Sequence, residues 1–288
     1  MAPSGVAIET GLEGMRVLVT GASGGIGDAI AACFASQGAK LALHAGRGGE
    51  RLRARVAEAG WSDAQVVEAD LADAGATETM VEAAADALGG LDICIANAGI
   101  WPGDSPPLRS TPIARIERVL QVNLFGAIHT SRAFLRLLAR RGPRDDGRGA
   151  SICYVGSTAG RFGEAGHTTY SVSKAGMYGL VRSLKNEIVA IDPYGRVNMV
   201  EPGWTVTPMA EAALEEPGVI EGVLRTMPLR QLARAEDIAR AIVVLSSPHL
   251  SRHTSGEVLT IAGGMEGRVQ WDVSEIDPDA VRRRLKED

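Results

Sequence analysis

Tyr170 and Lys174 lie four residues apart in the stretch TYSVSK, an arrangement that suits proton transfer. Residues i and i+4 share one face of a helix. A protonated lysine beside a phenol favours the phenolate, so we expect a lowered Tyr170 pKa and proton exchange with a bound oxygen near neutral pH. Ser157, at the end of an expected strand, could hydrogen-bond the same oxygen. Taken singly, each residue also has an ordinary structural interpretation: Tyr170 could pack in the core, Lys174 could be solvated, and Ser157 could be a strand-end hydroxyl.

Alternating strands and helices must position these side chains. Short, nearly continuous apolar runs are typical of strands buried on both faces. Their alternation with helical segments predicts an α/β fold, a doubly wound, seven-stranded parallel sheet with right-handed crossovers. Thr111 and Pro112 fit the N-cap and first turn of one helix. The expected strands are 15–21, 39–45, 64–71, 91–99, 150–157, 195–203 and 257–264, and the expected helices are 25–37, 50–60, 74–88, 111–140, 168–190 and 235–247.

The pattern divides the chain into a single domain, residues 14–265, with two flanking segments. Residues 1–13 form an N-terminal extension and residues 266–288 a C-terminal tail. Within the domain, residues 205–230 are expected to form a small helical lid over the substrate. The tail either frays or, as Trp271 favours, packs on a neighbouring subunit.

Composition and charge exclude several function classes. The net charge of -5 argues against nucleic acid as a partner. No apolar run approaches the roughly 20 residues of a membrane span, and the N-terminus has no signal-peptide pattern. Cys33, Cys94 and Cys153 lie in apolar segments without the paired spacing of a zinc site. We therefore expect a cytoplasmic protein with buried thiols, no metal and no membrane partner.

The glycine-rich stretch VTGASGGIGDAI lies directly between the first strand and the first helix. A turn of this kind presents backbone N–H groups and the positive end of a helix to a pyrophosphate. A glycine cluster alone is weak evidence, but the strand and helix on either side predict a Rossmann-type dinucleotide site. The expected contacts are Gly21, Ser23, Gly25, Ile26 and Gly27.

The end of the second strand bears on which dinucleotide is bound. A carboxylate there would hold the adenosine ribose of NAD, but the chain has His44 to Arg47. Arg47 could accept the 2′-phosphate of NADP, which favours NADP. NAD stays possible because Glu50 could reach the ribose, Arg47 could be a surface arginine, and Gly24 stands where NADP-binding chains often carry a basic residue.

Six stretches in order resemble the short-chain dehydrogenase/reductase family. They cover roughly residues 14–265; the departures are Ala96, where a second asparagine is common, Trp204 and the tail. The stretches are TGASGGIG (20–27), ANAG (96–99), QVNLFG (121–126), VGSTAGRFGEAGHTTYSVSK (155–174), EPGWTVT (201–207) and RAEDIARAIVVLSS (234–247).

The resemblance implies roles for individual residues. Lys174 also holds the nicotinamide ribose, and Asn123 holds a water that links this lysine to solvent. The implied catalytic set is Asn123, Ser157, Tyr170 and Lys174, and Tyr170 also contacts the cofactor. Further implied cofactor contacts are Asp70, Leu71, Asn97, Ala98, Gly99, Pro202, Gly203, Thr205 and Thr207. Capping roles stay open for Asp70 and Thr207.

Residues beside these motifs predict the substrate pocket. Trp101, Trp204, His167 and Ser157 are expected to line it, with Phe162 as a further candidate. The two tryptophans indicate a flat or partly apolar substrate. His167 could instead be an ordinary loop residue, and Arg161 meets either an anionic group or solvent.

Together these residues predict an NAD(P)-dependent oxidoreductase that interconverts a secondary alcohol and a ketone, with Tyr170 as general acid and base. Reduction of 3-oxoacyl groups, sugar oxidation and tailoring of a secondary metabolite are all open. The alternative is a cofactor-sensing or scaffold protein without turnover; dehydratase or epimerase chemistry ranks below both. The resemblance also implies a homo-oligomer, expected to be a tetramer, although the apolar stripe of helix 111–140 also fits packing on the sheet.

Overall fold

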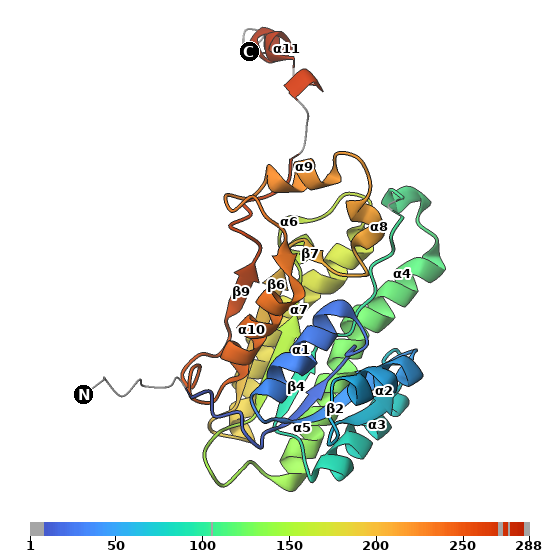
Figure 1. Ribbon diagram of the computed structural model, residues 1–288. Coiled ribbons are helices and arrows are strands. Elements are labelled where there is room, and N and C mark those ends of the chain that lie inside the picture. The colour runs from blue at the N-terminus through green and yellow to red at the C-terminus, as the bar shows by residue number, and fades with distance from the viewer. Residues whose placement is uncertain (1–8, 105, 270–272, 276, 285–288) are drawn as a thin grey trace, which may run out of the picture.

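The computed structural model describes residues 9–104, 106–269, 273–275 and 277–284. Within them, seven parallel strands form one sheet in the order β3-β2-β1-β4-β5-β6-β9, with helices on both faces (Figure 1). This confirms the predicted doubly wound fold. The strands are β1 (Arg16–Val19), β2 (Lys40–Ala45), β3 (Gln65–Glu68), β4 (Ile93–Ala96), β5 (Ser151–Val155), β6 (Arg196–Pro202) and β9 (Val258–Ile261).

Each face of the sheet buries its own set of side chains. Along β1, Val17 and Val19 pack on one face and Leu18 on the other, as the alternation of a strand requires. Helices α1 (Gly25–Ser36), α2 (Gly49–Glu58) and α10 (Ala235–Ser246) cover the first face; helices α3 (Ala74–Leu88), α5 (Gly126–Arg141) and α7 (Thr168–Glu187) cover the second.

The chain changes direction across the sheet between β1 and β4. From β1 the connections run outward to β2 and β3, and from β4 they run the other way to β5, β6 and β9. The loops after β1 and β4 therefore leave the carboxyl edge on opposite sides. A crevice forms at such a point and is the usual ligand site of these sheets.

The helix expected at 111–140 is interrupted. It consists of α4 (Ile113–Leu120), one π-helical turn (Gln121–Phe125) and α5. The capping prediction was wrong, since α4 begins after Pro112 and the Thr111 hydroxyl donates to the carbonyls of Pro106 and Pro107 instead. The preceding 3-10 turn (Leu108–Ser110) brings those carbonyls within reach of Thr111.

The segment 205–230 contains two short helices, α8 (Glu211–Leu214) and α9 (Val219–Leu224). Strand β7 (Thr205–Val206) pairs with β8 (Ala233–Arg234), so the segment leaves and rejoins the domain at one place. Met227 packs with Ala262 and Met265 beneath α9. The segment is thus helical, as expected, and its role as a lid stays a prediction.

Both flanking segments are described in part. In the N-terminal extension, Leu12 is fully buried in the core and the Thr10 carbonyl accepts a hydrogen bond from the Ser247 hydroxyl. The tail contains a 3-10 turn (Val273–Glu275) and α11 (Pro278–Arg284). Trp271 lies outside the described residues, so packing of the tail on a neighbouring subunit stays a prediction.

The three cysteines are free thiols; Cys94 and Cys153 are buried, and Cys33 is half-buried. Burial raises the pKa of both Cys94 and Cys153 to about 12. In the described part of the chain no helix is long and apolar enough to cross a membrane.

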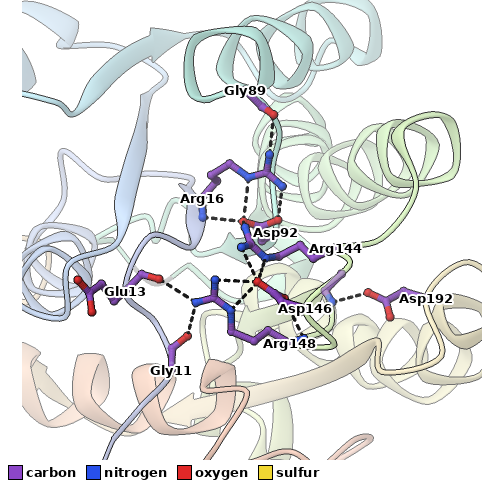
Figure 2. Close-up of polar contacts among 10 residues, drawn as sticks. Gly11, Glu13, Arg16, Gly89, Asp92, Arg144, Asp146, Arg148 and Asp192 are labelled. Carbon is purple, nitrogen blue, oxygen red and sulfur yellow. Dashed lines mark hydrogen bonds and ion pairs between the residues drawn. The ribbon is translucent and has the colours of Figure 1, made fainter.

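An arginine–aspartate network holds the amino edge of the sheet, opposite the crevice (Figure 2). Asp92, only 2 % exposed, accepts hydrogen bonds from the Arg16 backbone and guanidinium and from Arg144 Nη1. Asp146 accepts from Arg144 and Arg148, and Arg148 reaches the carbonyls of Gly11 and Glu13. The network fastens the charged loop before β5 to β1 and to the N-terminal segment.

We expect Asp92→Ala to lower the free energy of unfolding by roughly 2–4 kcal/mol, because Arg16 and Arg144 would lose the carboxylate that they share. Urea unfolding measures the change. The matched control is Asp145→Ala on the same loop, since Asp145 is exposed and has no hydrogen bond or ion pair with any described residue. Its expected change is within about 0.5 kcal/mol. Equal effects of the two substitutions would contradict a stabilising role for the network.

Candidate active site

A cavity of about 570 Å³ opens at the carboxyl edge of the sheet, where the loops after β1 and β4 diverge. It gathers nearly all of the predicted site residues; Asn123 and His167 lie outside its lining. The predicted residues that line it are Gly21, Ser23, Gly25, Ile26, Gly27, Arg47, Asp70, Leu71, Asn97, Ala98, Gly99, Trp101, Ser157, Tyr170, Lys174, Pro202, Gly203, Trp204, Thr205 and Thr207.

The turn between β1 and α1 is packed so closely that only glycine fits at two positions. Gly21 has a φ of +66°, and a Cβ there would lie 2.8 Å from Ala98 Cα. A Cβ on Gly27 would lie 2.1 Å from the Gly21 carbonyl oxygen. Helix α1 begins at Gly25, and its N-cap, Gly24, has no side chain to satisfy the first N–H groups. These exposed donors fit a pyrophosphate.

His44, at the end of β2, holds this turn in place. Its Nδ1 accepts the Gly21 N–H at 3.2 Å, and its Nε2 lies 3.0 Å from the Ala69 carbonyl oxygen. A donor at one nitrogen and an acceptor at the other require a neutral ring protonated at Nε2. Burial lowers the His44 pKa, which favours the same neutral form. No sequence motif assigns this role to His44.

Tyr170 on α7 and Ser157 after β5 meet in the cavity. The Ser157 hydroxyl also caps the short helix α6 (Thr158–Phe162) by accepting the Ala159 N–H at 3.1 Å. Burial raises the Tyr170 pKa to about 12, and hydrogen bonding to Ser157 opposes this shift. The prediction that protein groups lower the Tyr170 pKa is therefore wrong. Burial of the phenol raises this pKa by more than the hydrogen bond to Ser157 lowers it.

Lys174 does not act on the phenol as a close charge. Its Nζ donates to the Val155 carbonyl at 2.9 Å and lies 5.8 Å from the centre of the Tyr170 ring. The side chain is buried, and burial lowers its pKa to about 8. The i, i+4 spacing thus brings the two residues to the same cavity, as predicted, while the lysine is anchored to the end of β5.

Asn123 lies behind the cavity in the π-helical turn. Its Oδ1 accepts the Ile100 N–H at 2.7 Å, and its Nδ2 donates to the Ile100 carbonyl and the Ser173 hydroxyl. The side chain therefore fixes the segment after β4. A π-helical turn is often found at a functional site, and here it carries a fully buried asparagine.

At the other end of the cavity, Arg47 and Asp70 lie near each other. Asp70 forms an ion pair of 2.9 Å with Arg118 and accepts the Ala72 N–H. The hydrogen bond from Arg118 lowers the Asp70 pKa, and the charge of Arg47 adds to this. Asp70 does not cap α3, whose N-cap is Asp73.

Aromatic side chains form the wall on the Tyr170 side. Trp101 stacks on His167 with 4.6 Å between ring centres, and Trp204 meets Trp101 edge-on at 6.2 Å. Both tryptophans line the cavity, whereas His167 supports Trp101 from behind. Phe162 packs against Met227, Ala262 and Met265 instead. Arg161 lies outside the cavity and is 51 % exposed, with its Nη1 3.8 Å from the Glu201 carboxylate, so the structure has it at the surface and not against a bound anion.

Comparison with known proteins places this geometry in a family. A family model described as enoyl-(acyl carrier protein) reductase matches residues 21–266. An L-rhamnose 1-dehydrogenase (NAD(P)(+)) of Azotobacter vinelandii is 35 % identical over 86 % of this chain and 95 % of its own length. An acetoacetyl-CoA reductase of a Synechocystis species is 34 % identical over 89 % of this chain and 98 % of its own. A short-chain dehydrogenase of Burkholderia cenocepacia, solved in complex with NADP, has a TM-score of 0.78 at 34 % identity, covering 88 % of this chain and 98 % of that one.

The chain belongs to the short-chain dehydrogenase/reductase family. It is accordingly an NAD(P)-dependent oxidoreductase of that family, which confirms the predicted enzyme class.

This short-chain dehydrogenase/reductase also has cavity residues that the sequence analysis missed. Some stand inside the quoted motifs beside the residues with assigned roles, and the others, Arg118 and Arg268 among them, lie outside every motif, so no spacing in the sequence pointed to them. They are Gly24, His44, Gly46, Ala69, Ile100, Arg118, Val122, Val155, Gly156, Thr158, Glu164, Met209, Ala210 and Arg268.

The buried lysine gives the enzyme a distinct pH dependence of stability. The Lys174 pKa is about 8 in the folded protein against an ordinary 10.5, so between these values the unfolded chain binds the extra proton. Stability should therefore rise with pH in this window. We expect the wild type to gain about 2–3 kcal/mol relative to Lys174→Met between pH 7 and pH 10, as measured by urea unfolding. Parallel curves for the two proteins would show that the lysine is not desolvated.

Proposed function

We propose that this chain is an NADP-dependent oxidoreductase that interconverts a secondary alcohol and a ketone, with Tyr170 as the general acid and base. The observation that carries the proposal is the meeting of the Tyr170 and Ser157 hydroxyls and the Lys174 ammonium in the cavity that the glycine turn opens into. The NADP complex of the Burkholderia relative supports the choice of dinucleotide.

When bound, the nicotinamide dinucleotide supplies or accepts a hydride; the side chains handle the oxygen and its proton. In the reducing direction, Tyr170 gives its proton to the substrate oxygen while Ser157 donates a hydrogen bond to the same atom. A Tyr170 pKa of about 12 keeps this proton in place until the oxygen becomes basic. Lys174, anchored on Val155, holds positive charge beneath the reacting groups.

We propose the cofactor contacts from the family resemblance, and the presence of these residues in the cavity lining supports them. The free N–H groups at the start of α1 would hold the pyrophosphate, and the loop of Asn97 to Gly99 would pass beneath the adenosine ribose. Asp70 with the Leu71 backbone would contact the adenine. Gly203 and Thr207 would meet the carboxamide end, and Arg47 would meet the 2′-phosphate.

We further propose a homotetramer in the cytoplasm. Large apolar side chains are exposed at two separate places, on the α4–α7 side (Ile113, Phe125 and Val172) and on the α10–β9 side (Val244 and Leu259). Two apolar faces suit an assembly with two kinds of contact. The free thiols suit a reducing compartment.

Tyr170→Phe should reduce kcat at least about 100-fold, because the proton donor is removed and the ring is kept. NADPH consumption with a panel of ketones measures turnover, and fluorescence titration of NADPH should give an unchanged dissociation constant. The matched control is Tyr194→Phe, which removes a hydroxyl from an exposed ring outside the cavity. A catalytically silent cofactor sensor would instead bind NADPH and turn over no ketone in either form.

Arg47→Ala should raise the KM for NADP about 10- to 100-fold and leave the KM for NAD nearly unchanged, because a charged hydrogen bond to the 2′-phosphate is lost. Arg53→Ala is the control, since Arg53 is paired with Glu68 and does not line the cavity. An equal rise for both dinucleotides would contradict the role given to Arg47.

A further inference from the structure

Arg268 enters the cavity from the segment that follows the last strand. It lines the cavity together with Tyr170, Ser157 and the two tryptophans. Its Nε donates to the Gly163 carbonyl at 3.0 Å, and its Nη1 contacts Met265 Sδ at 3.5 Å. The guanidinium is therefore held at a defined place, between the loop after α6 and the cluster beneath α9.

The segment that carries Arg268 is itself anchored. Met265 is buried in that cluster with Met227 and Ala262, and the Glu266 N–H donates to the Thr226 carbonyl at 3.2 Å. Figure 1 shows the chain running from β9 towards α9 at this point. Arg268 is thus positioned by the body of the domain.

The charge of Arg268 has no carboxylate partner among the described residues. No described Asp or Glu lies within ion-pair distance of it, and its two polar partners are a carbonyl oxygen and a sulfur. Burial lowers the Arg268 pKa, and the charge of Glu164, which does not pair with it, opposes this shift only in part. An anionic ligand would pair with this charge and accept hydrogen bonds from the guanidinium N–H groups that have no partner among the described residues.

Glu164 limits what that anion can be. Its carboxylate lines the same cavity and attracts Arg268 without pairing with it. A ligand with several negative charges would be repelled by Glu164, whereas a single carboxylate matches the planar fork of the guanidinium. The cavity of about 570 Å³ also has to hold the dinucleotide, so the remaining space suits a small molecule.

We propose that Arg268 binds the carboxylate of the substrate, so that the enzyme acts on small oxo acids and the corresponding hydroxy acids. The carbonyl group then faces Tyr170 and Ser157, and the carbon chain lies along Trp101 and Trp204. This assignment of a substrate class rests on the proposed oxidoreductase function. Arg268 is a specificity-determining residue in it and takes no part in the proton transfer.

The test compares carboxylates with their neutral esters. Initial rates with NADPH are measured for straight-chain 3-oxo, 4-oxo and 5-oxo acids and for the methyl ester of each. We expect kcat/KM for the best acid to exceed that of its ester at least 10-fold. In Arg268→Met this ratio should fall to about 1, because the charged hydrogen bonds are worth about 10- to 100-fold. Arg268→Lys should retain part of the preference.

Two controls separate recognition from folding. Arg161→Met removes a nearby arginine that is exposed and outside the cavity, and it should leave the ratio unchanged. Thermal unfolding and NADPH titration should give the same values for Arg268→Met as for the wild type. A loss of NADPH binding in Arg268→Met would contradict a role confined to the substrate.

Binding of each acid to the enzyme with NADP, followed by tryptophan fluorescence, provides a readout that does not depend on turnover. Acid binding that weakens in Arg268→Met supports carboxylate binding by Arg268 whether or not turnover is seen; if neither acids nor esters are then reduced, it is the oxidoreductase proposal that fails. Esters reduced as well as or better than acids by the wild type would overturn the inference and leave the oxidoreductase proposal standing. A wild type that neither binds nor reduces any acid and reduces no ester would overturn both.

Discussion

The hydrogen bond from Lys174 Nζ to the Val155 carbonyl is the contact on which the arrangement of the active site depends. It joins the middle of α7 to the end of β5 and so sets the position of Tyr170 against Ser157, two residues beyond Val155. Gly99 lies close by, since a Cβ there would stand 3.3 Å from Asn123 Oδ1 and 3.4 Å from the lysine nitrogen. Asn123 then fixes the same loop from behind through Ile100. A helix, two strand ends and a π-helical turn thus meet around one buried ammonium group.

Burial moves the pKa values of the two central groups in opposite directions. It raises that of Tyr170 to about 12 and lowers that of Lys174 to about 8, so the phenol keeps its proton and the ammonium holds its own less firmly. Two side chains with nearly equal reference pKa values are thus moved apart by the same loss of solvent, because burial disfavours the charged form of each. Any positive charge added to this cavity would shift the phenol towards its anion.

The two edges of the sheet differ in how their charged and polar groups are paired. At the amino edge, arginines and aspartates pair with one another and fasten the chain (Figure 2). At the carboxyl edge, Arg268 lacks such a partner among the described residues, and no side chain caps the first N–H groups of α1. Charges and donors that are satisfied stabilise the protein, and those left open are available to ligands.

The seven strands, the main helices and the glycine turn were predictable from the sequence, because each depends on local periodicity and on a short motif. The same is true of the residues at strand ends, since parallel strands bring their carboxyl ends to one edge. The π-helical turn at Asn123 and the failed Thr111 cap were not predictable, because both depend on how one helix meets its neighbours. The tertiary structure alone decided the direction of the Tyr170 pKa shift and the placing of Arg268, rather than Arg161, at the cavity. Sequence spacing determines which face of an element a side chain occupies, whereas solvent exclusion and contacts between distant segments exist only once the chain has folded.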